Sequence, residues 1–426
     1  MGFLNSHHLA KAADVLAFSQ PVLLILVYLS IVLGSPPAVL TWSLLIVSIA
    51  PACMAKGAFR RRTPFDIPIL IFIVGLSISL SFSPYREISL ETFQTYMLCI
   101  VAYYLIVFNG LRSAWYWRLV VAIVVVLSFT TVVTATFAQQ SPGARVLPYN
   151  EWLYHAASKL PLTHNYHLTV NTLGGILGVI APGLVGYAIL SSDRRDKAVM
   201  WVFGVLAAVL VVLASSSSGL VAMLAGLAFI LWLRWRWTLG IIIPVGLIWL
   251  WLTFSNNLYL PEWATWLAPH KTFIQRIDLW RGSAQLIVDH LFTGLGPGAW
   301  FLRSNLQVDG WPVINPHNDT LTLMSDAGVL AGVAFIAVIV TVGIILRRMI
   351  RYPAGNPWRA LGLAIGASMV AFAANGIWET NVTGTLLPIP VGDMVYRYKC
   401  LATPTLWILL ALFVVAWIRL SNTKRE

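Results

Sequence analysis

The sequence predicts an all-α, polytopic membrane protein with about twelve transmembrane helices. Of its 426 residues, 58% are hydrophobic and only 10% are charged, whereas a soluble protein of this size carries about 25% charged residues. Predominantly apolar runs long enough to cross the hydrocarbon core recur along the whole chain. We expect spans at 19–35, 37–55, 66–83, 92–109, 116–138, 168–191, 198–214, 217–233, 237–254, 325–346, 359–378 and 402–419.

The distribution of basic residues predicts the orientation of these spans. If the N-terminus lies in the cytoplasm, every short loop on that side is basic, and 19 of the 28 Lys and Arg residues fall there. An even number of spans then places both termini in the cytoplasm. The net charge of +12 is explained by this topology, so it does not indicate nucleic acid as a partner. We interpret the first apolar run as a retained span, because it lacks a small-residue cleavage site.

Two long stretches between spans fall outside the cytoplasm in this orientation, and we expect a single membrane domain, 1–426, with its chemistry there. They are 139–167 and the larger loop 255–317, which lies between spans 9 and 10. The span centres carry essentially no Asp, Glu, Lys, Arg or His, which argues against a proton pathway. Neither ATP nor a nucleotide sugar is available outside, so a group transfer needs a donor that is already activated. A lipid-linked diphosphate is the natural candidate.

The larger loop contains a segment with helical periodicity, 273–291, whose apolar stripe can lie on a membrane surface. Arg276 has no acidic residue three or four positions later and lies nearer this stripe, an unusual place for a solvated charge. We therefore predict a functional role for Arg276. Arg281 follows Asp278 by three residues, so a simple i,i+3 ion pair is as good an explanation as ligand binding.

A glycine-rich turn, "GLGPGAWF", follows this segment and contains Gly294, Gly296 and Gly298. Their backbone N–H groups could form an anion-binding nest, although glycines in a tight turn often indicate only the turn. The sequence has no Asp-x-Asp or similar carboxylate cluster that would hold Mg²⁺. We therefore expect no metal and no cofactor.

A histidine stands near the start of the helix that we expect to lead into the tenth predicted span. Asn315 and Pro316 predict a helix start, with Asn as the N-cap and Pro in the first position. His317 would then lie in the first turn, where the helix dipole favours an anion and a neutral imidazole that can accept a proton. An ordinary interfacial histidine is the alternative. Asp319 is a possible second base, but acidic residues are also typical of first turns.

The order of these motifs resembles the C-terminal half of the O-antigen ligase and O-antigen polymerase superfamily. The motifs are Arg276 four residues before a tryptophan, then "LFTGLGPGAWF", then "HNDTLTLMSDAGVLAG". The ligases carry His-Asn, nine residues and then Gly-x-x-Gly. Here His317 and Asn318 precede nine residues and Gly328, but Ala331 stands at the second glycine position.

A second departure from the superfamily lies in "SSSSG", where Ser218 stands at a position at which the family commonly has an arginine. If that arginine binds the donor diphosphate, another cation must do so in this chain. Arg145 and Arg281 are the candidates. His164 and His167, at the end of the shorter loop, are either acceptor-site or interfacial residues.

The resemblance implies a GT-C-like glycosyltransferase of the bacterial inner membrane with its active site facing the periplasm. It implies inverting, metal-independent transfer of O-antigen from undecaprenyl diphosphate to lipid A-core. His317 and Arg276 would be catalytic. The substrate-binding candidates are Arg281, Arg145, Asn318, Gly294, Gly296 and Gly298.

Three alternatives remain open at this point. An O-antigen polymerase would use a second lipid-linked glycan as the acceptor, and a protein O-oligosaccharyltransferase would use a protein. A flippase of lipid-linked glycans belongs to another class of protein, and it would need a polar path through the bundle. The lack of charged residues in the spans argues against such a path.

Overall fold

The computed structural model describes residues 62–138, 170–213, 216–255, 270–304, 307–308, 311–313, 315–380, 387–391, 394–398 and 402–423. The first two predicted spans, 19–35 and 37–55, lie outside the described residues. So does the predicted loop 139–167, which contains Arg145, His164 and His167.

Within the described part, helices occupy the other ten predicted spans. They are α3 (Asp66–Phe82), α4 (Arg86–Arg112), α5 (Tyr116–Ala138), α7 (Val170–Leu190), α8 (Arg194–Leu213), α9 (Ser217–Arg234), α10 (Leu239–Ser255), α13 (Asp319–Met349), α14 (Pro357–Trp378) and α15 (Ala402–Asn422). Five of them, α4, α9, α13, α14 and α15, are long and apolar enough to cross a membrane. The chain is therefore a polytopic helical protein, whereas the total of twelve spans and their orientation stay predictions.

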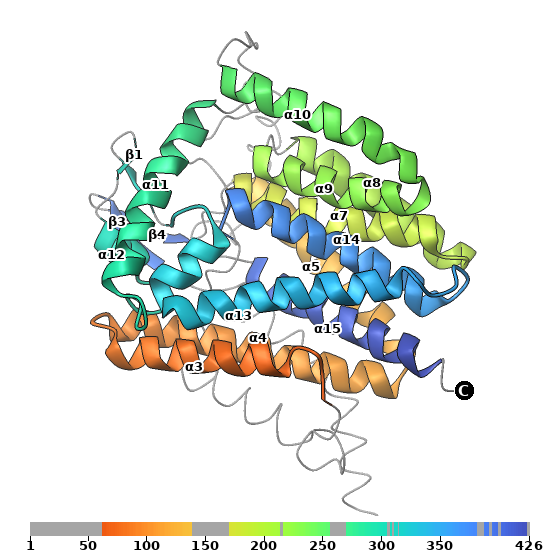
Figure 1. Cartoon of the computed structure of the whole chain (residues 1–426), viewed down its shortest axis with the longest axis horizontal. Helices are drawn as coiled ribbons and strands as arrows, with labels where there is room; N and C mark the ends of the chain where they lie inside the picture. The colour runs from red at the N-terminus through yellow and green to blue at the C-terminus, as the bar shows by residue number, and fades with distance from the viewer. Residues whose placement is uncertain are drawn as a thin grey trace, which may run out of the picture.

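The long helices form a bundle in which most lie lengthwise beside one another (Figure 1). Helix α13 packs along α3, α15 packs along α4 and α14, and α7 contacts α8, α9 and α14. Helix α11 (His270–Asp289) confirms the helix predicted over 273–291. Figure 1 shows α11 crossing one end of the bundle, where it contacts α13. The short helices η2 (Arg236–Thr238) and α12 (Trp300–Ser304) complete the described helices.

Two short antiparallel hairpins correct the prediction of a purely α-helical chain. Strand β1 (Gln307–Val308) pairs with β2 (Trp311–Pro312), and β3 (Leu387–Val391) pairs with β4 (Met394–Tyr398). Both hairpins lie between predicted spans. The sequences "LPIPV" and "MVYRY" contain the β-branched and aromatic residues that favour strands. Hydropathy over long windows detects spans and is insensitive to such short strands.

Glycine residues bring α7 and α9 into close contact. A Cβ added to Gly178 would collide with the backbone of Gly219, and one added to Gly174 would collide with the side chain of Ser216. Small residues at these positions let two helix backbones approach closely, as is typical of helix pairs in membranes. This contact fixes where the start of α9 lies beside α7.

Helix α13 is kinked at Gly328, where φ is 77°. The element therefore consists of two helical pieces that meet at Gly328. The backbone N–H of Val329 donates to the carbonyl of Leu291 at 2.8 Å, and a Cβ on Gly328 would collide with the carbonyl of Phe292. The turn that follows α11 thus lies against the kink. The kink lets the first piece of α13 turn toward α11 at the end of the bundle (Figure 1).

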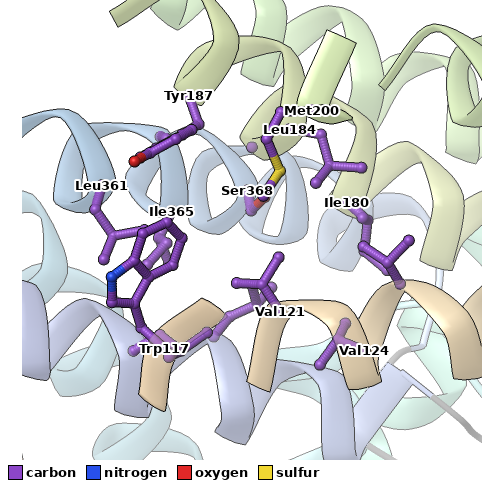
Figure 2. A pocket seen from close by; sticks show the side chains of 15 residues that line it. Trp117, Val121, Val124, Ile180, Leu184, Tyr187, Met200, Leu361, Ile365 and Ser368 are labelled. Carbon is purple, nitrogen blue, oxygen red and sulfur yellow. The ribbon is translucent and has the colours of Figure 1, made fainter. Parts of the chain in front are cut away.

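An apolar pocket lies inside the bundle, among α5, α7, α8, α14 and α15. Figure 2 shows Trp117 and Val121 of α5, Ile180 of α7 and Ile365 of α14 around it, with Tyr187 and Ser368 among the surrounding side chains. Its lining carries no Asp, Glu, Lys, Arg or His. This pocket therefore offers neither an acid nor a base for the chemistry expected of the chain.

Candidate functional site

Three ionisable side chains from separate segments meet at the end of the bundle where α11 crosses α13. Arg276 comes from α11, His317 precedes α13, and Glu379 follows α14 directly. Nδ1 of His317 lies 2.6 Å from Oε1 of Glu379, and Nη2 of Arg276 lies 3.6 Å from Oε2 of the same carboxylate. Glu379 thus bridges the two residues that sequence reasoning selected as catalytic.

The start of α13 differs from the prediction. Asn318, rather than Asn315, caps the helix, because its side chain accepts the N–H of Leu321 at 3.0 Å. His317 has a φ of 52°, a left-handed conformation that a right-handed helix does not admit. His317 therefore lies before the cap and not in the first turn. Contacts with other residues hold His317 in place. The predicted effect of the helix dipole on a first-turn imidazole therefore does not apply to it.

The backbone on both sides of His317 is held in place. Asn315 accepts the N–H of His317 through Oδ1 at 2.9 Å, and Nε1 of Trp280 on α11 donates to the carbonyl of Pro316 at 3.0 Å. On the other side, the N–H of Asn318 donates to Oγ1 of Thr380 at 3.1 Å. Left-handed backbone at a non-glycine residue costs about 1–3 kcal/mol and persists where such contacts over-determine it.

Asn318 was predicted to contact substrate, and the structure gives each of its polar groups a partner within the protein. Its Oδ1 caps α13, its backbone N–H bonds Thr380, and its Nδ2 donates to the carbonyl of Ile377 at 3.2 Å. The residue therefore joins the start of α13 to the end of α14. This is the contact that brings His317 and Glu379 together.

Arg276 is buried, with an exposed fraction of 7%. Burial lowers the pKa of its guanidinium, and the neighbouring Glu379 opposes that shift; arginine stays protonated in proteins nonetheless. Its Nε has no hydrogen-bond partner among the residues that the structure describes. A buried cation with an unused donor is costly unless a ligand supplies an acceptor.

Glu379 is an ionised carboxylate that the protein nearly encloses. Burial by itself raises the pKa of Glu379, but His317 and Arg276 more than offset this effect and hold the pKa below its ordinary value. The backbone N–H of Thr380 adds a weaker contact at 3.3 Å to Oε1. The side chain of Glu379 is 9% exposed, against 27% for that of His317. The imidazole is thus the more accessible end of the pair.

Arg281 contrasts with Arg276 on the same helix. Its side chain is 77% exposed, and its Nη1 lies 3.3 Å from Oδ1 of Asp278. The i,i+3 ion pair, one of the two predicted alternatives, is therefore confirmed for this residue. Among the described residues, the Arg281 side chain pairs with Asp278 and not with the cluster of Arg276, His317 and Glu379 (hereafter the ionic cluster).

The glycine-rich turn binds a carboxyl group, and that group belongs to the chain itself. Gly294, Gly296 and Gly298 have φ values of 60°, 114° and 76°. The N–H groups of Gly298 and Trp300 donate to the carboxylate of Asp326 at 3.1 and 2.8 Å, and the N–H of Gly296 donates to its backbone carbonyl at 2.9 Å. Of the three predicted N–H donors, only that of Gly298 reaches the carboxyl group of Asp326, whereas that of Gly294 donates to the carbonyl of His290. These contacts to Asp326 anchor the turn to α13.

Comparison with known protein families gives a match in the region that contains this site. Residues 202–336 match the family model described as O-antigen ligase. This match supports membership in the O-antigen ligase superfamily. The resemblance inferred from the motifs is thus confirmed, and a search of curated proteins found no match. The matched segment runs from α8 to the first half of α13, so it contains Arg276 and His317 and ends before Glu379.

Ser218, which stands where the resemblance leads one to expect an arginine, lies at the start of α9 where this helix packs closely against α7. Ser218 is buried, and its Oγ is 3.4 Å from that of Ser216, the residue that caps α9 by accepting the N–H of Gly219. The neighbouring contact with α7 depends on glycine residues. Arg145, one of two cations suggested as a replacement for the family arginine, lies outside the described residues.

Sequence reasoning missed Glu379 and Asp326. Each had a visible signal, because each is a carboxylate at the edge of an apolar run: Glu379 directly follows the predicted span 359–378, and Asp326 is the second residue of 325–346. Charged residues at such positions are rarely buried without a partner. Their partners Trp300, His317 and Arg276 lie 26, 62 and 103 residues away in sequence, so the signal did not indicate which residues they contact.

Proposed function

We propose that this protein is a glycosyltransferase that moves a glycan from a polyprenyl diphosphate to an acceptor hydroxyl. Within the O-antigen ligase superfamily, the reaction we favour joins O-antigen from undecaprenyl diphosphate to lipid A-core. We place the reaction at the periplasmic face of the bacterial inner membrane, with both termini of the single membrane domain in the cytoplasm. The loops 139–167 and 255–317 would then face the periplasm.

The ionic cluster carries this proposal. It sets a partly exposed imidazole, His317, beside a buried guanidinium, Arg276, at the end of an apolar helical bundle. A lipid-linked diphosphate presents its phosphates at the membrane surface, which is where an interfacial helix such as α11 would lie. The Nε–H of Arg276, which has no hydrogen-bond partner among the described residues, would be a charged donor for a phosphate oxygen.

The transfer we propose is a single displacement at the anomeric carbon. The acceptor oxygen bonds to this carbon while the bond from the carbon to the diphosphate oxygen breaks, and the configuration is inverted. The hydroxyl proton passes to the ring nitrogen of His317 that Glu379 does not engage, and the diphosphate leaves with the bonding electrons. Arg276 stabilises the negative charge that develops on the diphosphate. Removal of a general base typically costs a factor of about 10² to 10⁴.

Reconstituted transfer provides the test. Purified protein in liposomes receives undecaprenyl-diphosphate-linked O-antigen and lipid A-core, and the product is measured. We expect His317→Ala to lower kcat by about 10²- to 10⁴-fold. We expect His317→Gln to be similarly impaired, because an amide keeps a hydrogen bond but cannot take the proton at neutral pH.

His290→Gln is the matched control, because His290 lies in the turn after α11 and outside the contacts that define the ionic cluster. We expect it to retain activity. Activity of His317→Ala within tenfold of the unchanged protein would overturn the assignment of the base. A wild-type protein that transfers glycan to a second lipid-linked glycan, and not to lipid A-core, would change the acceptor and leave the chemistry in place.

A further inference from the structure

We propose that Glu379 is the positioning residue of this reaction: it fixes the tautomer of His317 so that Nε2 is the ring nitrogen that accepts the proton. The inference rests on the proposed function and extends it to a residue outside the matched family segment. Glu379 itself touches neither the glycan donor nor the acceptor. It acts through the imidazole.

The geometry of the pair determines the tautomer. An ionised carboxylate has no hydrogen to donate, so the ring nitrogen that faces it must carry the hydrogen. Nδ1 of His317 faces Oε1 of Glu379 at 2.6 Å, which is the short distance typical of charge-assisted hydrogen bonds. A neutral imidazole with hydrogen on Nδ1 has its lone pair on Nε2. The nitrogen that accepts a proton is therefore assigned.

The surroundings of Glu379 keep its carboxylate ionised and in place. From α11, Arg276 lies 3.6 Å from Oε2, and the backbone N–H of Thr380 lies 3.3 Å from Oε1. From α13, Asp319 lies against Gly376, three residues before Glu379 on the chain. The cationic Arg276 and the protonatable His317 thus outweigh the carboxylate of Asp319, and they favour the ionised form of Glu379.

The same contact gains strength during the transfer. When His317 accepts the proton it becomes an imidazolium, and the adjacent carboxylate stabilises the new charge. The side chain of Glu379 is only 9% exposed, so solvent screens this attraction little. The left-handed backbone at His317 and its anchored flanks place the ring, while Glu379 sets its rotation and its hydrogen. A merely structural ion pair between Arg276 and Glu379 would do neither for the imidazole.

Glu379→Gln is the primary test, because it keeps the size of the side chain and removes the charge. A glutamine can donate its N–H to Nδ1, which favours the opposite tautomer. We expect kcat to fall by about 10²- to 10⁴-fold, with the KM for the donor changed by less than about threefold, as for a loss confined to the transition state. The acidic limb of the kcat–pH profile should also move to lower pH, since an amide does not favour the protonated ring.

Two further variants keep the proposal falsifiable if Glu379→Gln does not fold. Glu379→Asp retains the charge but moves it one methylene away from His317. Because the contact to the base is then weaker, we expect kcat to be about 10- to 100-fold lower. The acidic limb of the kcat–pH profile should not move. In a His317→Ala background, a change at Glu379 should cost almost nothing more, because both residues act through one proton acceptor. Asp278→Asn, an exposed acid-to-amide change on α11, is the matched control and should be silent.

The outcomes separate this inference from the proposed function. If the unchanged protein shows no glycan transfer, the proposed function fails. If transfer is present and His317→Ala abolishes it, while Glu379→Gln or Glu379→Asp keeps full kcat, the positioning role is wrong and the function stands. Additive losses in the double variant would likewise overturn the inference, because they would show that Glu379 acts independently of His317.

Discussion

Asp326 and Glu379 are both buried carboxylates at the end of the bundle near α11, with exposed fractions of 5% and 7%, but their partners differ in kind. Asp326 accepts hydrogen bonds from the backbone N–H groups of Gly298 and Trp300. Glu379 contacts the side chains of His317 and Arg276. Backbone amides neither titrate nor change rotamer. An imidazole can gain or lose a proton, and an arginine side chain can change rotamer.

This difference indicates what each carboxylate can do. The partners of Asp326 close a turn and hold it against the kink in α13, which is a permanent connection of scaffold segments. The partners of Glu379 are ionisable side chains: in the proposed reaction His317 takes a proton and Arg276 contacts a substrate phosphate. Perturbed ionisable clusters in such a setting are typical of functional sites. Variants of Arg276, Asp326 and Arg281 test this difference between the two carboxylates.

The largest effect should follow from Arg276→Ala. It leaves Glu379 buried with the imidazole alone, and breaking a buried ion pair in this way typically costs about 3–5 kcal/mol. We expect a lower midpoint of thermal unfolding in detergent and loss of glycan transfer. Arg276→Lys should recover part of the stability but little transfer, since an ammonium cannot reproduce the fork of a guanidinium on a diphosphate.

The double variant Arg276→Met with Glu379→Gln separates the two readouts of this prediction. Removing both charges takes away the uncompensated carboxylate, so stability should return toward that of the unchanged protein. Transfer should stay lost. A single variant Arg276→Ala that is both stable and fully active would show that the ion pair contributes neither to the fold nor to the reaction.

A smaller effect is expected of Asp326→Asn. One oxygen remains to accept a backbone N–H, while the amide nitrogen faces a donor, so one buried N–H loses its acceptor at a cost of about 1–3 kcal/mol. The midpoint of unfolding should fall, and kcat per folded molecule should stay close to that of the unchanged protein. If instead kcat fell with no change in stability, Asp326 would belong with Glu379 and the distinction between them would be wrong.

Hydropathy and helical periodicity predicted most of the described helices, including α11, because apolar length and the amphipathic period are properties of contiguous residues. They did not predict the kink at Gly328 or the choice of Asn318 over Asn315 as the cap. Both asparagines satisfy the local rule for capping. Contacts from α11 to Pro316 and from Thr380 to Asn318 decide between them.

The site was predictable as single residues and not as a cluster. Arg276 and His317 were conspicuous because each is an ionisable group in an unusual position within its own segment. Their connection depends on Glu379, which is 62 residues from His317 and joins it only after α13 and α14 have packed together. The glycine-rich turn was predicted to offer backbone N–H groups to an anion, and the N–H of Gly298 donates to the carboxyl group of Asp326. Spacing alone gave no reason to choose Asp326 over a substrate phosphate.

The smallest effect should follow from Arg281→Ala, on the same helix as Arg276. Arg281 and Asp278 are 77% and 67% exposed, and an exposed pair three residues apart contributes less than about 1 kcal/mol. We expect unfolding and kcat to be unchanged within error, and any decrease in donor affinity to disappear at high salt, because exposed charges are screened. Measured beside Arg276→Ala, this variant tests whether burial against Glu379 separates the two arginines. A loss of kcat in Arg281→Ala comparable to that of Arg276→Ala would move the diphosphate contact to the exposed face of α11.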